Sequence, residues 1–223
     1  MRTKNILFTT LFFAAAMFAS LFAGEGLDYM KSVLTRFEVL RGELVDDFSA
    51  DNRRVVTGKA RDLALEILDI DEIGRLALGK HYSKMSAQQK KDFSNLFHDL
   101  MASRVVEANI PSQKIVSKEI PIKIVDDKEQ SDKIFKKDAV VVLTQVPHKR
   151  VTYNVDFKLF RKGGTLRLYD VVIDGSSTLL DFRNQFSAII QKKGVNYLIS
   201  RLKTRMQELE KEQEDRLSGQ NED

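Results

Sequence analysis

Residues that carry chemistry are scarce in this 223-residue sequence. Cysteine is absent, which excludes a disulfide framework, a thiolate zinc site, a thiol nucleophile and a lipid-modified N-terminal cysteine. The three histidines, His81, His98 and His148, lack the spacing of a metal-binding pair. Segment 175–177 lacks the second glycine of a nucleophile elbow, and no Gly-rich phosphate loop occurs. We therefore expect no metal, no cofactor and no catalytic site.

An excess of charge of one sign is also lacking. The formal net charge is +4, and removal of residues 1–23 would take away Arg2 and Lys4 and no acid, leaving +2. The basic residues are scattered among acids, without the aromatic–basic alternation of RNA-binding surfaces. We therefore expect no nucleic-acid partner, although a weak preference for anionic membrane surfaces stays open.

The first 23 residues have the pattern of a cleaved signal peptide. Arg2 and Lys4 give a positive start, residues 6–22 are almost all apolar, and Ala23 offers a small residue before a cleavage point. Leu21 is bulkier than the residue usual two places earlier. The alternative is an uncleaved membrane anchor, since an apolar run of about 17 residues is at the short limit for crossing a bilayer.

Helical periodicity predicts helices in the first half of the remaining chain. Apolar residues recur every three to four positions over residues 27–45, and residues 60–68 form a further helical stretch. The polar segment 49–59 between them is predicted to be a connection. A capping box formed by Ser86 and Gln89 opens a long helix that ends at residues 109–111.

The middle of the chain predicts strands, and its end predicts helices again. Residues 126–132 are predicted to be a charged turn, and Gly163-Gly164 is typical of a hairpin. A change of phase in the last strand indicates a bulge or burial on both faces. Residues 208–223 are predicted to be a charged, frayed or disordered tail. The expected strands cover residues 113–125, 139–146, 151–160 and 166–173.

These elements predict one α+β domain over residues 24–207. It would contain an antiparallel sheet of about four strands with helices packed on it, enclosing an apolar cavity. Segment 168–186 joins the last strand to the covering helix through a turn at Asp174-Gly175 and a cap at residues 176–178. Apolar side chains lie on both sides of this corner, which suggests a container.

Two separated motifs resemble the MlaC family of periplasmic phospholipid-transport proteins. The first runs from the last strand into the helix after it, and the second precedes and opens the long helix. Together they span roughly residues 70–202, in the order typical of that family. The first consists of Tyr169, Asp170, Val171, Val172, Gly175, Ser177, Arg183, Gln185, Phe186 and Gly194, and the second of Asp71, Arg75, Leu78, Gly79, Tyr82, Gln88, Phe93 and Phe97.

The resemblance implies a soluble periplasmic carrier with phospholipid as its cargo and no cofactor. Such a carrier would move lipid between an outer-membrane lipoprotein–porin complex and an inner-membrane ABC transporter with an MCE-type subunit. No covalent bond would be made or broken. A two-chain lipid has on the order of 30 methylenes, and at about 0.8 kcal/mol each their burial is worth roughly 20 kcal/mol.

Candidate site residues follow from the pattern and the resemblance together. Lys80, Lys84 and Arg183 could meet a headgroup or a partner protein, and Arg75 and Arg183 could equally pair with acids. Aromatic and β-branched residues could line the lipid tails or could simply fill a core. The tail-binding candidates are Phe97, Met101, Tyr153, Val155, Phe157, Tyr169, Val171, Phe182 and Phe186.

Two other classes of function stay open at this point. One is an enzyme with a cone-shaped cavity between helices and sheet, which would need convergent polar groups with perturbed pKa values. The other is an envelope adaptor that keeps its N-terminal helix as a membrane anchor and has an ordinary filled core.

Overall fold

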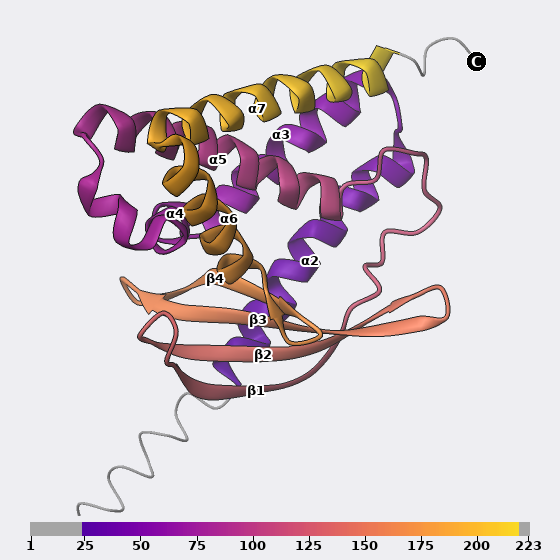
Figure 1. Ribbon diagram of the computed structural model, residues 1–223. Coiled ribbons are helices and arrows are strands. Elements are labelled where there is room, and N and C mark those ends of the chain that lie inside the picture. The colour runs from indigo at the N-terminus through magenta and orange to yellow at the C-terminus, as the bar shows by residue number, and fades with distance from the viewer. Residues whose placement is uncertain (1–23, 219–223) are drawn as a thin grey trace, which may run out of the picture.

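A computed structural model describes residues 24–218, in which helices lie over one twisted antiparallel sheet (Figure 1). The predicted signal peptide, residues 1–23, lies outside the described residues. The helical elements are α2 (Glu25–Asp46), α3 (Ala50–Ile67), α4 (Ile70–Leu78), the 3₁₀ helix η1 (Gly79–Lys84), α5 (Ala87–Asn109), α6 (Thr178–Lys193) and α7 (Val195–Ser218). The strands are β1 (Lys123–Asp132), β2 (Lys137–His148), β3 (Val151–Lys162), β4 (Thr165–Ile173) and β5 (Ser176–Ser177).

The sheet confirms the predicted α+β class. Its order is β1-β2-β3-β4-β5, with every neighbouring pair antiparallel, and β5 is only two residues long. At Lys158/Leu159 the register of β3 against β4 shifts by one residue, which makes Tyr169 the extra residue of a bulge. The predicted change of phase in this strand is therefore explained by the bulge.

The first strand starts later than the sequence predicted. Residues 113–122 are not in a strand, and the predicted charged turn, 126–132, is paired with β2 throughout. The prediction was wrong here because β1 is an edge strand, most of whose side chains are exposed. Charged residues are common at such edges, where they discourage pairing with other chains.

The predicted connection at residues 49–59 is also wrong, because α3 already begins at Ala50. Ser49 caps this helix by accepting a hydrogen bond from the backbone N–H of Asn52. Val56 and Ala60 are buried on its inner face. Asp51, Arg54 and Lys59 of this segment are exposed on the outside of the helix, and such charged residues hid its apolar stripe.

Helix α7 also differs from the sequence prediction, because it continues to Ser218 instead of giving way to a tail at Glu208. Met206 and Leu209 are buried, so the helix keeps an apolar contact beyond the predicted boundary. The charged side chains of this stretch fit a solvent-facing helix surface as well as they fit a tail. Residues 219–223 lie outside the described part of the chain.

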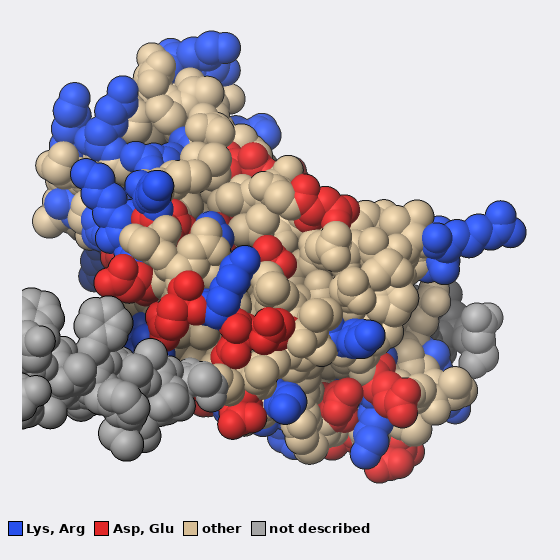
Figure 2. Space-filling view, turned by 90° about the horizontal axis from the view of Figure 1, so that it is seen from below, with Lys and Arg blue, Asp and Glu red and all other residues tan. Residues whose placement is uncertain are grey.

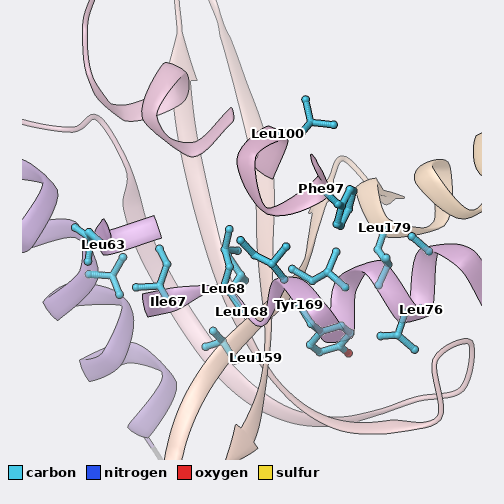
Figure 3. Packing of buried hydrophobic residues seen from close by; sticks show 14 of the residues in the cluster. Leu63, Ile67, Leu68, Leu76, Phe97, Leu100, Leu159, Leu168, Tyr169 and Leu179 are labelled. Atoms are coloured by element: carbon cyan, nitrogen blue, oxygen red, sulfur yellow. The ribbon is translucent and has the colours of Figure 1, made fainter. Parts of the chain in front are cut away.

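The core lies between the sheet and the helices. Helix α2 packs on β1 and β2, whereas α3, α4 and α6 pack on β4 (Figure 1). The two chain segments that meet in the centre are joined by a parallel bridge between Leu68 and Leu168, which Figure 3 shows side by side. Between Gly24 and Ser218 no helix is both long enough and apolar enough to cross a membrane.

Candidate functional site

A small apolar cavity lies where β4 meets the helices. Its volume is about 40 Å³. One water molecule takes about 30 Å³ in the liquid, so an acyl chain does not fit while the layers stand in this position. This hollow lies at the expected corner but is much smaller than the lipid-sized cavity that was predicted. Its lining is Leu68, Ile73, Met101, Leu168, Tyr169, Asp170, Val171, Thr178, Leu179 and Phe182.

Aromatic side chains from α5 and α6 fill the space beside this cavity. The ring centroids of Phe97 and Phe182 are 5.8 Å apart, and those of Phe93 and Phe186 are also 5.8 Å apart. Both pairs meet edge to face, the arrangement that aromatic quadrupoles favour. Figure 3 shows Phe97 pointing into the same cluster as Leu179. These contacts hold α6 against α5 and explain why the cavity is small.

The predicted tail-binding residues of β3 lie at different depths. Phe157 is partly buried and stands opposite Val171 of β4, next to the cavity. Val155 is half-buried two pairs further along, opposite Ile173. Tyr153 is 36% exposed and pairs with Val146 of β2, towards the free end of the hairpin. The structure therefore brings Met101, Tyr169, Val171 and Phe182 together around the cavity, and it leaves Tyr153 outside.

A buried polar network joins side chains of β1, β3 and β4. Lys158 Nζ is 2.9 Å from Asp132 Oδ2 and 3.6 Å from Asp170 Oδ2. The hydroxyl of Tyr169 donates to Asp132, at 3.0 Å. Burial raises the pKa of Tyr169, and the nearby Asp132 carboxylate raises it further. Burial alone would raise the pKa of Asp132, but hydrogen bonds from Lys158, the Phe135 N–H and Tyr169 outweigh it and lower that pKa.

Asp170 connects this network to the start of α6. Its carboxylate accepts hydrogen bonds from Ser177 Oγ at 2.7 Å and from the Leu179 N–H at 2.9 Å. Ser177 Oγ in turn accepts from the Leu180 N–H, which confirms the predicted cap. Burial raises the pKa of Asp170. These bonds serve to fasten a helix end to a strand, and both acids of the network are paired with the Lys158 ammonium.

The sequence places Asp170 in a family motif but gives no sign that Asp132 and Lys158 are its neighbours. The three residues come from strands β4, β1 and β3, and only the sheet register places them together. Lys158 gave no sign of this contact, because it occupies one of the polar positions expected in the alternating strand 151–160.

The three predicted headgroup or partner residues come together at η1. Lys80 and Lys84 are exposed on this 3₁₀ helix. Arg183 of α6 lies against Gly79, where an added Cβ would come within 3.0 Å of Arg183 Nε. Arg183 has no hydrogen bond or ion pair with any described residue, whereas Arg75 is paired with Glu72 at 2.6 Å. Of these two arginines, only Arg75 therefore forms an ion pair with an acid among the described residues.

The charges of this surface influence His81. Burial lowers the pKa of His81, and the positive charges of Lys80 and Lys84 lower it further. His81 Nε2 lies 3.2 Å from Ser187 Oγ, and His98 Nε2 lies 3.0 Å from Asp71 Oδ1.

On the face seen from below, Lys and Arg side chains gather at one corner of the molecule, and positive and negative side chains are mixed elsewhere (Figure 2). Among the side chains that the structure describes, no group could hold a metal ion.

The fold and the site define an α+β protein whose helices cover an antiparallel sheet, with an apolar pocket where β4 meets the helices. Comparison with known sequences specifies the family. The sequence model of the family described as MlaC protein matches residues 43–204, and the chain belongs to the MlaC family. The resemblance seen in the two sequence motifs is confirmed.

Two known proteins are similar to this chain. The Intermembrane phospholipid transport system binding protein MlaC from Haemophilus influenzae is 26% identical over 144 residues, and the match covers 64% of each chain. A phospholipid-binding protein from Ralstonia solanacearum, solved in complex with a phospholipid, has the same fold. That comparison gives a TM-score of 0.61 at 18% identity and covers 84% of this chain and 97% of the other.

Proposed function

We propose that the protein is a carrier that holds a phospholipid by its acyl chains between β4 and the helices α4, α5 and α6. The observation that carries the proposal is the apolar cavity at this junction, lined by Met101, Val171 and Phe182. The names of the relatives support the choice of ligand, since one is a phospholipid transport protein and the other is a phospholipid complex.

Lipid binding in this site requires the layers to separate. On the order of 30 methylenes, each about the size of a 30 Å³ water molecule, need several hundred Å³, against about 40 Å³ in the structure. The gross gain from burying these methylenes, roughly 20 kcal/mol, is large enough to compensate for apolar contacts that are lost when the helices move.

Helix α6 is the element we expect to move. It is bounded by Gly175 and Gly194, whose φ values of +87° and +81° are conformations that glycine adopts without strain. Leu179 and Phe186 are the only buried residues of this helix. A rotation about the two glycine positions would open the cavity between α6 and β4 while strands β1 to β4 stay paired. It would break the short β4–β5 pairing and the hydrogen bonds from Ser177 and Leu179 to Asp170.

The headgroup would stay at the surface near η1. Lys80, Lys84 and Arg183 are the groups there that can meet a phosphate, and Arg183 has a guanidinium without a partner among the described residues. Arginine binds phosphate oxygens well because its donors form a planar fork. The same surface could instead dock a partner protein.

The proposal also covers location and partners. The carrier would be exported by a signal peptide over residues 1–23 and would act in the periplasm. It would receive or deliver lipid at an outer-membrane lipoprotein–porin complex and at an inner-membrane ABC transporter with an MCE-type subunit. The basis for these partners is the family to which the chain belongs.

Organic extraction and mass spectrometry of the purified chain 24–223 test the proposal. We expect close to one phospholipid per chain, and at least a severalfold lower content in Val171→Gln, because a polar amide in the cavity lining opposes acyl chains. The matched control is Val151→Gln, which changes a 53% exposed valine at the start of β3 and should keep the lipid. Lipid-free wild-type protein that also fails to take up lipid from vesicles would refute the proposal.

A further inference from the structure

A second and larger hollow lies far from the sheet, between α3, α5 and α7. Its volume is about 430 Å³, within the range of ligand sites in proteins. At about 30 Å³ for a group the size of a water molecule, it holds roughly 14 such groups. Val106, Ile110, Met206 and Leu209 form its apolar wall. We call it the α3–α7 groove; the three helices that form it are seen in the upper part of Figure 1.

Arg53 of α3 lines this groove and is only 6% exposed. Its Nε atom is fully buried without a hydrogen-bond partner, the sole such side-chain nitrogen or oxygen in the described part of the chain. The guanidinium carbon lies 5.1 Å from the ring centroid of Phe48, and Arg53 has no ion pair within residues 24–218. A buried cation without an anion is unfavourable, so its presence points to a ligand that supplies one.

The other two arginines of the groove are already paired. Arg61 forms an ion pair with Asp99, and Arg54 pairs with Asp51 at 2.9 Å. Glu212 lies 3.3 Å from Arg205. Arg53 is therefore the arginine of the groove that is left to bind an anion.

Gly58 lines the groove on its α3 side and faces open space. A Cβ added to this residue would meet no atom within 4 Å, and the residue has ordinary helical geometry. Glycine inside a helix costs about 1 kcal/mol relative to alanine. Neither packing nor backbone conformation requires glycine here, so a side chain introduced at position 58 can extend into the open space of the groove.

We propose that the α3–α7 groove binds a single-chain amphiphile with a monoanionic oxygen headgroup, either a carboxylate or a phosphodiester. The headgroup accepts hydrogen bonds from the Arg53 guanidinium, and the chain lies along Val106, Ile110, Met206 and Leu209. Glu210 is exposed at the rim and repels a second negative charge, which favours a monoanion. This site is separate from the sheet–helix cavity and does not depend on the proposed phospholipid carriage.

Calorimetric titration of the chain 24–223 with dodecanoate, below its micelle concentration, tests the proposal. We expect saturable binding at one site, and binding at least about tenfold weaker to Arg53→Met, because charge-assisted hydrogen bonds are lost. Without ligand, the urea midpoint of Arg53→Met should equal or exceed that of wild type, because an unpaired buried charge is removed. The matched control, Arg201→Met, changes an exposed arginine of α7 outside the groove and should bind as wild type.

A second pair of variants separates occupation of the groove from folding. Gly58→Leu should fill the groove and lose binding, while Gly58→Ala should keep it, and both should be at least as stable as wild type because helix propensity rises. Val171→Gln should bind dodecanoate normally, even if the proposed phospholipid carriage fails. Dodecylphosphocholine in place of dodecanoate distinguishes a phosphodiester from a carboxylate ligand. Absence of binding by wild type, equal binding by Arg53→Met, or equal affinity for neutral dodecanol would overturn the proposal.

Discussion

At the scale of single residues, Gly26 fixes how closely α2 approaches the sheet. A Cβ at this position would lie 2.6 Å from Val140 Cγ1 and 2.9 Å from Val142 Cγ2, distances at which atoms must move. We expect Gly26→Ala to lower the free energy of unfolding by about 1–3 kcal/mol, as overpacked cores do. In the same helix Gly42 has only the flexible Lys118 side chain nearby, at 3.8 Å, so Gly42→Ala should stabilise by about 0.5–1 kcal/mol. Urea denaturation of the two variants measures both changes, and equal effects would contradict this reading.

Individual candidate residues could be predicted from the sequence only as types. Met101, Val171 and Phe182 met at the cavity because they lie on the apolar faces that periodicity identified. Tyr153 follows the same alternation in β3, but it lies beyond the part of the strand that the helices cover. Arg53 could not be predicted at all, because a buried arginine looks the same in sequence as an exposed one.

At the scale of elements, α6 is fastened to the sheet through Asp170. We expect Asp170→Ala to destabilise the protein by about 2–4 kcal/mol. The substitution removes the carboxylate to which the Leu179 N–H and the Ser177 hydroxyl donate hydrogen bonds, and it leaves both donors without this partner. Hydrogen exchange followed by mass spectrometry should show faster exchange in α6 than in α5. Asp181→Ala is the control, because it removes an exposed acid from the same first turn. Exchange that rises equally in both helices would argue against a local role for Asp170.

Element boundaries were predictable where a local signal marks them. The capping box of Ser86 and Gln89 begins α5 as predicted, and both of its hydrogen bonds are present. The errors at residues 49–59 and 126–132 share one cause. Charge was taken as a sign of loops, yet a helix with one buried stripe and an edge strand both carry charged residues on their open sides.

At the scale of the whole molecule, the fold class followed from the order of helical and strand patterns, but the size of the cavity did not. Cavity volume depends on how Phe97, Phe182 and Phe186 settle against each other across two helices. Such contacts join residues about 90 positions apart, and no sequence period reports them. The α3–α7 groove is a similar case, because three helices far apart in the chain form it.

The pH dependence of stability also belongs to the whole molecule, because several acids contribute. Hydrogen bonds from Arg75 and Lys137 lower the pKa of Glu72, and hydrogen bonds from Ser94 and His98 lower that of Asp71. An acid with a lowered pKa in the folded state stabilises it above its unfolded pKa, and this contribution is lost as the pH falls through the folded pKa. We therefore expect the urea midpoint to fall below about pH 4.5, and Glu72→Gln to make that fall smaller.

Asp170 gives the opposite sign. Because burial raises its pKa, the contribution of Asp170 to stability is complete below its unfolded pKa and is lost as the pH rises through the folded pKa. The stability of Asp170→Asn relative to wild type should accordingly be greater at pH 7 than at pH 4. Urea titrations of both proteins at the two pH values measure the difference. A relative stability that is unchanged or greater at pH 4 would show that the Lys158 ammonium, 3.6 Å away, offsets the cost of burying this carboxylate.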